Sequence, residues 1–328
     1  MASGVFRIAH ISDTHVSPEY NRHNIRKLKG VLAYVVDMAY DHVAITGDIT
    51  GHGESRDFRS IRRLLKYFDL LNYDRLTVTI GNHDVFGGVH KAEDLVSFRR
   101  HCKITPFDLQ IAQFERAFRE TFPKKAFENE SLFPFVKILG PVALIGMNSI
   151  RAFHPILNPV GSNGAVFPGQ IESARKILDH PLVAGLQKIV LIHHHFGSYD
   201  PHSTSFSGRI AYMIEGLSLR QFGKKRLEDF LSDHGVSAVL HGHTHVEGFY
   251  NRSGIKFSST ALNPMIPRSI KLDGGMLQRT AGAPFNEIAI HGGGKIEMTR
   301  MLVIDDERRV TVHVPEAGVL EQIQLEPE

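Results

Sequence analysis

The chain has 328 residues, a formal net charge of +3 and 42% hydrophobic residues, which is enough for a large folded core. The pI is near 8.9, but no run of lysine or arginine resembles a nucleic-acid-binding footprint, so we expect no nucleic-acid partner. No stretch approaches the roughly 18 apolar residues that a transmembrane segment needs. The single cysteine excludes an intramolecular disulfide, which fits a reducing compartment. The first strand starts near Val5, so a cleaved leader would remove part of the core, and we expect a cytoplasmic protein.

Hydrophobic periodicity predicts alternating strands and helices in the first part of the chain. Residues 5–11 form a nearly continuous apolar run, which indicates a strand buried on both faces. Apolar residues recur at helical spacing over 24–35 and again over 55–70. Short apolar runs at 43–45 and 76–80 predict two further strands. This alternation is typical of an α/β layered architecture.

The rest of the chain contains more strands and ends mainly in β structure. We expect strands at 135–138, 142–147, 188–192, 236–240, 287–290, 295–304 and 310–314, helices at 170–178 and 226–231, and a hairpin over 248–257. Two long stretches, at about 85–133 and 196–223, interrupt the pattern, and we interpret them as insertions that include a cap-like element. Residues 1–313 are expected to form one domain, followed by an acidic tail at 314–328.

Polar clusters directly follow five of the predicted strands. They are Asp13-Thr14-His15, Gly47-Asp48, Gly81-Asn82-His83-Asp84, His193-His194-His195 and His241-Gly242-His243-Thr244-His245. A single cluster of this kind is ordinary turn chemistry. Open α/β sheets, however, place their sites at the carboxyl ends of strands, so five such clusters together indicate one shared site.

The side chains in these clusters favour divalent metal ions. Imidazoles combined with carboxylate and amide oxygens suit manganese, iron or zinc, and the lack of cysteine ligands argues against a structural zinc site. The two oxygens of Asp48 can contact two ions about 3.5–4 Å apart. Two divalent ions carry four positive charges, and Asp13, Asp48 and one hydroxide remove three of them. The remaining charge of about +1 attracts a phosphate group.

In order and spacing, these motifs resemble those of the calcineurin-like metallophosphoesterase family, over residues 13–245. The resemblance implies an α/β (α+β) fold, a four-layer double β-sandwich flanked by helices, with two divalent metal ions at one edge. It implies the following ligands: Asp13, His15 and His245 for one metal, Asn82, His193 and His243 for the other, and Asp48 as the bridge. It also implies hydrolysis of phosphoester bonds by attack of a metal-bound hydroxide on phosphorus.

Two other residues of the motifs are expected to be catalytic. Adjacent side chains point apart on an extended backbone, so His83 should turn away from the metals if Asn82 binds one of them. We expect His83 to protonate the leaving group, with Asp84 orienting its ring. By the same alternation, His193 and His195 should share one side of a strand, and His194 is interpreted as a structural histidine.

The sequence leaves the substrate open. A phosphodiester of a small molecule is the leading expectation, and apolar residues within 198–223 also allow a lipid substrate, as in the lipid A pathway pyrophosphohydrolases, which would place the protein at a membrane periphery. A noncatalytic scaffold is a third interpretation, disfavoured because all seven ligand positions and His83 are present. Purple acid phosphatase chemistry would need a tyrosinate ligand, and no tyrosine lies beside the motifs. The identity of the metals and the oligomeric state are not specified.

Overall fold

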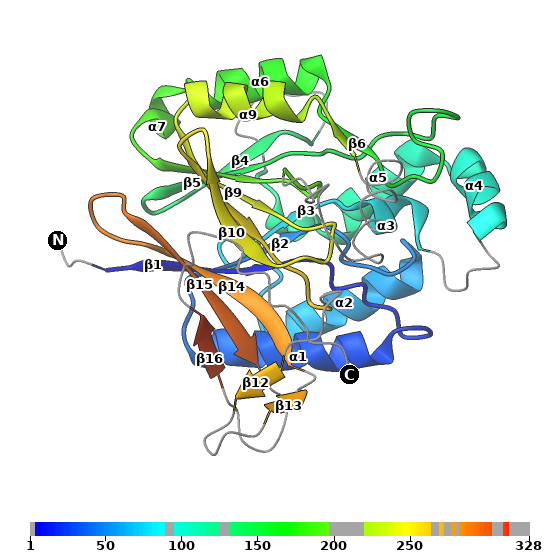
Figure 1. The fold of residues 1–328 in the computed structure, drawn as a ribbon, viewed down its shortest axis with the longest axis horizontal. Coiled ribbons are helices and arrows are strands. Elements are labelled where there is room, and N and C mark those ends of the chain that lie inside the picture. The colour runs from blue at the N-terminus through cyan, green and yellow to red at the C-terminus, as the bar shows by residue number, and fades with distance from the viewer. Residues whose placement is uncertain are drawn as a thin grey trace.

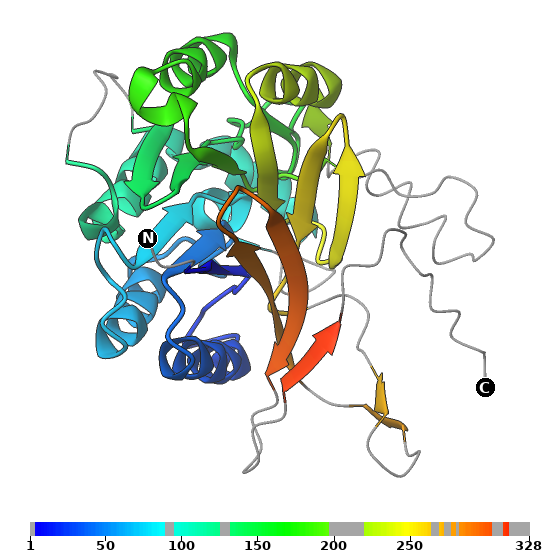
Figure 2. The ribbon, with the colours of Figure 1, turned by 90° about the vertical axis from the view of Figure 1, so that its left-hand side faces the viewer.

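The computed structural model describes residues 4–88, 95–124, 132–196, 220–263, 269–271, 277–279, 282–303 and 311–314. Two six-stranded sheets pack face to face, and helices cover both outer faces (Figures 1 and 2). The predicted four-layer double β-sandwich is therefore confirmed. Within the described ranges, no helix is long and apolar enough to cross a membrane.

The first sheet has the strand order β16-β15-β14-β1-β2-β3. Its parallel half consists of β1 (Phe6–Ile11), β2 (His42–Thr46) and β3 (Leu76–Thr79). Its antiparallel half consists of β14 (Ala283–Ile290), β15 (Ile296–Val303) and β16 (Thr311–Val314). The outer face is covered by α1 (Arg22–Asp37) and α2 (Ser55–Tyr67), which lie below the sheets in Figure 1.

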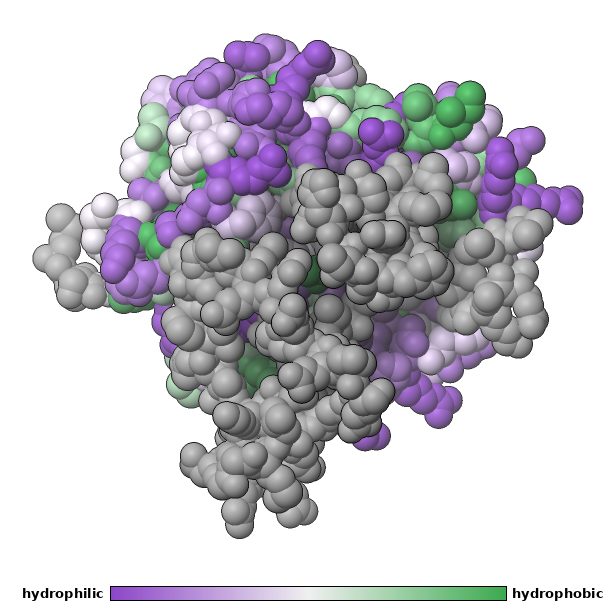
Figure 3. Space-filling view, in the orientation of Figure 1, coloured by the Kyte–Doolittle hydropathy of each residue, from purple (hydrophilic) through white to green (hydrophobic). Residues whose placement is uncertain are grey.

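The second sheet has the order β10-β11-β9-β7-β5-β4. Its strands are β4 (Phe135–Leu139), β5 (Val142–Gly146), β7 (Gln187–Leu191), β9 (Val236–His241), β10 (Gly248–Arg252) and β11 (Ile255–Ser259). The outer face is covered by α6 (Pro168–Leu178), α7 (Pro181–Ala184) and α9 (Lys224–Asp233). Hydrophilic residues cover the outward surface of α6 and α9 (Figure 3).

Three apolar layers hold this arrangement together. Ile8 of β1, Leu144 of β5 and Leu240 of β9 belong to the cluster between the two sheets, and all three are fully buried. Separate clusters lie under α1 and α2 and under α6 and α9. Because β1 and β2 run parallel, as do β7 and β9, the carboxyl ends of these strands meet at common edges of the two sheets.

The first insertion is largely helical. Its helices are α3 (Asn82–Phe86), α4 (Leu95–Ile104) and α5 (Phe107–Ala117), followed by the 3₁₀ turn η2 (Arg119–Thr121). Phe114 of α5 packs against Phe58 of α2 with ring centroids 6.3 Å apart, and the Gln113 amide donates to the Gly53 carbonyl at 2.7 Å. This segment is therefore anchored to the core beside the motif loops.

Some elements were not predicted, and some predictions fall outside the described residues. The additional short strands are β6 (Gly164–Ala165), β8 (Gln221–Phe222), β12 (Ser269–Lys271) and β13 (Leu277–Arg279). The expected helix over 55–70 ends at Tyr67, because Asp69 takes a left-handed conformation with φ 53°. Most of the cap-like insertion, 197–219, and of the acidic tail, 315–328, lies outside the described residues.

Candidate metal centre

The five polar clusters meet at one edge of the sandwich. The backbone N–H of Asp13 donates to the Gly47 carbonyl at 3.2 Å, which joins the loops after β1 and β2. Across the sandwich, the backbone N–H of His243 donates to both carboxylate oxygens of Asp13, at 3.1 and 3.0 Å. Loops from both sheets therefore build one site, as the strand-end pattern predicts.

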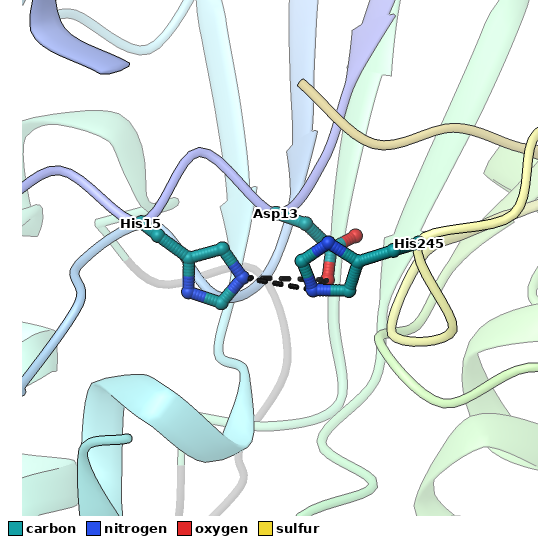
Figure 4. Close-up of side chains that lie close together, drawn as sticks. All are labelled: Asp13, His15 and His245. Carbon is teal, nitrogen blue, oxygen red and sulfur yellow. Dashed lines mark hydrogen bonds and ion pairs between the residues drawn. The ribbon is translucent and has the colours of Figure 1, made fainter. Parts of the chain in front are cut away.

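Asp13, His15 and His245 point toward one another and form a possible metal-binding group (Figure 4). The Nε2 atoms of the two histidines lie 3.1 Å apart, and Asp13 Oδ1 lies 4.0 Å from His15 Nε2 and 3.7 Å from His245 Nε2. His245 Nδ1–H donates to the Asn263 carbonyl at 3.0 Å, which leaves Nε2 as the coordinating nitrogen.

A second possible metal-binding group contains Asp48, His193 and His243, with Asn82 against it. Asn82 Oδ1 lies 3.0 Å from both His193 Nε2 and His243 Nδ1, and His193 Nε2 lies 3.3 Å from Asp48 Oδ1. His193 Nδ1–H donates to the Thr46 carbonyl at 2.9 Å, so its Nε2 carries a lone pair toward the centre.

The donor set fits divalent cations. In the neutral ring, His193 Nδ1 carries the proton, and Nε2 is an electron-pair donor that lies 3.0 Å from Asn82 Oδ1 and 3.3 Å from Asp48 Oδ1. Such close electron-rich atoms need either a proton on Nε2 or a cation between them. Asp48 belongs to two of the possible metal-binding groups, one with His15 and one with His193. Its Oδ1 faces His193, and its Oδ2 lies 3.9 Å from His15 Nε2. The residues therefore suit two ions that share Asp48.

Backbone strain is concentrated at this site. Among the described residues, eight other than glycine have positive φ, and five of these are the site residues Asp13 (52°), His15 (42°), Asp48 (47°), His243 (77°) and His245 (56°). Left-handed conformations cost free energy for residues with a Cβ, and they persist where surrounding structure enforces them. Here the strained turns aim side chains from separate loops at one point.

Two glycines allow the loops to approach closely. A Cβ at Gly81 would overlap the backbone nitrogen and the carboxylate of Asp48, and a Cβ at Gly242 would overlap Ser12 and the carboxylate of Asp13. The contact at Gly81 cannot be relieved by moving a flexible side-chain end alone, because it includes the backbone of Asp48. The glycines of the motifs therefore set the distances within the site.

The electrostatics of the site favour the ligand forms of three of its residues, Asp48, His15 and His243. Burial opposes ionisation of Asp48, but the imidazoles of His193 and His83 hold the pKa of Asp48 well below its usual value. Burial lowers the pKa of His15 and of His243, so these imidazoles stay neutral. Burial also acts to lower the pKa of His193, but the neighbouring Asp48 carboxylate has the larger effect and raises that pKa to about 9. A bound cation would compete with that proton.

His83 lies in the site, but not for the reason expected. Residues 82–86 form helix α3 rather than extended backbone, so the alternation argument does not apply. The His83 ring nevertheless packs edge-on to His15, and its Nδ1 lies 3.3 Å from the Gly51 carbonyl. Its Nε2 is 3.9 Å from Asp48 Oδ2, and the three residues His15, Asp48 and His83 could also surround an ion.

The role expected for Asp84 is corrected by its hydrogen bonds. Its carboxylate accepts from the backbone N–H groups of Gly81, Ile49 and Thr50 at 2.9, 3.3 and 2.8 Å, and from the Thr50 hydroxyl at 2.8 Å. The Gly51 carbonyl, and not Asp84, meets the ring of His83. Asp84 therefore ties the loop after β2 to the loop after β3.

The alternation expected for the three consecutive histidines is also wrong, because β7 ends at Leu191 and residues 193–195 are not part of it. The ring centroids of His193, His194 and His195 lie 4.9, 4.3 and 6.1 Å from that of His243. His194 bonds the Ser149 hydroxyl at 2.7 Å and the Ser162 carbonyl at 3.2 Å, as expected of a structural histidine.

Sequence reasoning missed the groups that orient the histidines. The Thr46, Gly51 and Asn263 carbonyls accept from His193, His83 and His245, and backbone acceptors carry no residue-type signal. Asn263 had one available signal, since it lies four residues beyond the end of β11, at the same edge. Asn21 and His23, before and within the first turn of α1, also border the site and were not predicted.

Comparison with known proteins identifies related folds. A family profile described as calcineurin-like phosphoesterase matches residues 6–247. A dimetal phosphatase from Danio rerio is 12% identical, with a TM-score of 0.55 over 94% of this chain and 98% of that one. A purple acid phosphatase from yellow lupin (Lupinus luteus) is also 12% identical, with a TM-score of 0.54 over 96% of this chain but 54% of that one. No curated protein matches the sequence.

Proposed function

The chain belongs to the calcineurin-like phosphoesterase family and is a metal-dependent phosphoester hydrolase, and from this premise we propose that it is a phosphodiesterase. Its proposed ligands are Asp13, His15 and His245 for one divalent ion, Asn82, His193 and His243 for the second, and Asp48 between them.

The observation that carries the ligand assignment is the position of Asp48. Its Oδ1 faces His193 at 3.3 Å and its Oδ2 faces His15 at 3.9 Å, so one carboxylate serves both groups. Asp48 is almost fully buried and its backbone is strained, with φ 47°. A carboxylate is held in this way where two cations must share it.

Two divalent ions, when bound, neutralise charge on the phosphate and make water a better nucleophile. In the proposed reaction, a water oxygen bonds to phosphorus while the bond from phosphorus to the alcohol oxygen breaks. The alcohol oxygen takes the Nε2 proton of His83 in its imidazolium form, and the proton that water loses returns to His83 through solvent. The Gly51 carbonyl accepts from His83 Nδ1–H and so directs Nε2 into the site.

The charge of the site supports a diester rather than a monoester. Asp13 and Asp48 are the two carboxylates of the proposed ligand set, and Asn82 is a neutral amide, so a centre with two divalent ions keeps a small positive charge of about +1 once a hydroxide is counted. A diester monoanion balances that charge, whereas a monoester dianion exceeds it.

The single buried thiol, Cys102, supports a proposed location in the reducing cytoplasm.

Hydrolysis of bis(p-nitrophenyl) phosphate in the presence of manganese tests this function. We expect metal-dependent release of nitrophenol, and we expect Asp48→Asn to lower kcat/KM at least about 100-fold, since even groups that only orient a ligand affect metal sites by about 10–100-fold. Asp69→Asn is the matched control, because Asp69 also has a positive φ of 53° but lies exposed after α2. It should retain full activity.

The other interpretations predict different results. A noncatalytic scaffold would show no activity above that of Asp48→Asn with any divalent metal. A pyrophosphohydrolase of lipid-linked substrates would cleave nucleotide diphosphate lipids and leave simple diesters intact. Either result would overturn the phosphodiesterase proposal.

A further inference from the structure

A pocket of about 310 Å³ opens beside the proposed metal centre. On one side it is lined by His15, His83 and His245, which belong to the centre itself. Its lining also includes Asn21, His23 and Asn263. The pocket is at the small end of the range of roughly 300–1,000 Å³ that is usual for ligand sites. It is continuous with the place where the reaction would occur.

The lining of this pocket is unusual in its chemistry. Among the residues that the structure describes, every lining residue is a histidine, an asparagine or a glycine, so this part of the lining has no apolar side chain, no carboxylate, no lysine and no arginine. Ligand pockets are normally lined mainly by apolar groups. An acyl chain placed here would remove water from polar groups and give no apolar contact in return. A second phosphate would lack the basic side chains that usually bind it.

Asn21 offers an unused amide to the pocket. It is the N-cap residue of α1, a position where an asparagine side chain normally accepts from the first helical N–H groups, yet it makes no such bond. Asn21 is only partly buried, so its amide can reach a ligand. An amide presents both a donor and an acceptor, and a hydroxyl group can satisfy both.

Further contacts hold the wall of the pocket in place. The Lys27 ammonium donates to Asn263 Oδ1 at 2.7 Å, and the Asn263 carbonyl accepts from His245. Asn24, which also lines the pocket, donates from its amide to the His15 carbonyl at 3.3 Å. The Lys27 ammonium is thus engaged with a residue of the wall, and the polar groups are held in place before a ligand arrives.

We infer that this pocket binds the leaving alcohol and that it selects a small hydroxylated alcohol of glycerol or sugar type, with Asn21 as a specificity-determining residue. The inference rests on the proposed phosphodiesterase function, because it uses His83 as the proton donor to the leaving oxygen. Since His83 lines the pocket, the leaving group must lie on this side of the phosphorus. The polar lining then decides which alcohol fits.

A pair of matched diesters tests the inference with the manganese-loaded protein. Methyl glyceryl phosphate and methyl propyl phosphate differ only in two hydroxyl groups, and release of glycerol or propanol reports cleavage of the relevant bond. We expect kcat/KM to be at least about tenfold higher for the glyceryl diester. Asn21→Leu should lower that ratio about three- to tenfold, the effect of one hydrogen bond. Arg26→Ala, an exposed change on the same helix, should leave both values unchanged.

The outcomes separate this inference from the function on which it rests. Metal-dependent hydrolysis of bis(p-nitrophenyl) phosphate with no preference for the glyceryl diester would overturn the inference and leave the function standing. A preference that Asn21→Leu does not reduce would overturn the role of Asn21. Asn21→Gly provides the same test with a residue that N-cap positions tolerate, should the leucine variant fold poorly. Failure to hydrolyse any diester would overturn both proposals.

Discussion

The imidazole rings of His15 and His245 stack at the metal-binding edge, with centroids 4.9 Å apart and an angle of 12° between their planes. Their Nε2 atoms lie 3.1 Å apart, although His245 Nδ1–H is already donated to the Asn263 carbonyl. Burial lowers the pKa of His15 well below its usual value, so the His15 ring remains neutral. The fold therefore holds two imidazole rings, from opposite sheets, in a position to share a cation.

This relationship predicts that metal ions stabilise the protein and that His245 carries part of the effect. A ligand that binds only the folded state adds about 2.7 kcal/mol at a concentration 100 times its Kd. We expect manganese to raise Tm by several degrees in differential scanning fluorimetry, and EDTA to reverse the shift. His245→Ala should lose about half of the shift, because the ion on that side loses a ligand.

His101→Ala is the control for this measurement, because His101 is an exposed histidine of α4. It should show the wild-type increase in Tm. An equal increase in wild type and His245→Ala would mean that the ions stabilise the fold without binding at His245.

Gly81 should tolerate no side chain. A Cβ at this position would overlap the backbone nitrogen of Asp48, so Gly81→Ala must displace Asp48 and its carboxylate. We expect kcat/KM for bis(p-nitrophenyl) phosphate to fall at least about 100-fold, as for loss of a group that orients a metal ligand. Gly169→Ala, in the first turn of α6, meets nothing within 4 Å and should leave activity unchanged. Equal activity of the two variants would show that the approach of Gly81 to Asp48 is not required.

The α/β layered architecture and the meeting of the polar clusters at one edge could be predicted from the sequence because both depend on repeated local patterns, whereas the double sandwich and the ligand set were implied by the family resemblance. Buried strands such as β1 appear as apolar runs, and a polar cluster after each of several strands marks one edge of the sheets. The hairpin of β10 and β11 was predicted from apolar runs on either side of Asn251 to Gly254, and the structure confirms it.

What the sequence did not reveal depends on contacts made between distant segments. Helix α3 was taken as extended backbone, although its first residues are held by Asp48, which accepts from the His83 N–H at 2.8 Å. The carbonyl groups that orient His193 and His83 belong to residues 147 and 32 positions away in the sequence. Backbone acceptors at such separations leave no pattern in residue type, so only the folded structure locates them.

Asp84 should be essential for structure rather than for proton transfer. Its carboxylate accepts from three backbone N–H groups and the Thr50 hydroxyl, and Asp84→Asn would turn an NH₂ group toward at least one of these donors. We expect a loss of about 2–3 kcal/mol in the free energy of unfolding, measured with urea. The exposed Asp229→Asn is the control. A variant of normal stability with the activity lost would instead indicate a direct catalytic role.

Lys137 should make stability depend on pH in the alkaline range. This fully buried lysine of β4 donates to the Leu76 carbonyl on β3, at 2.7 Å, and its ammonium lies 4.4 Å from the centre of the Tyr73 ring. Burial lowers its pKa to about 7, against an ordinary value near 10.4 in the unfolded chain. Between these two values the unfolded chain binds more protons, so the free energy of unfolding rises with pH.

We therefore expect wild type to gain stability over Lys137→Met as the pH is raised from about 7 to 9.5, by at most about 1.4 kcal/mol per pH unit. Urea unfolding of both proteins at each pH measures this difference, and the other titrating groups cancel because they are common to both. Lys188→Met serves as the control, since Lys188 also donates to a carbonyl, that of His234 at 2.8 Å, from a half-buried position. A difference between wild type and Lys137→Met that is constant with pH would mean that Lys137 stays charged in the folded protein.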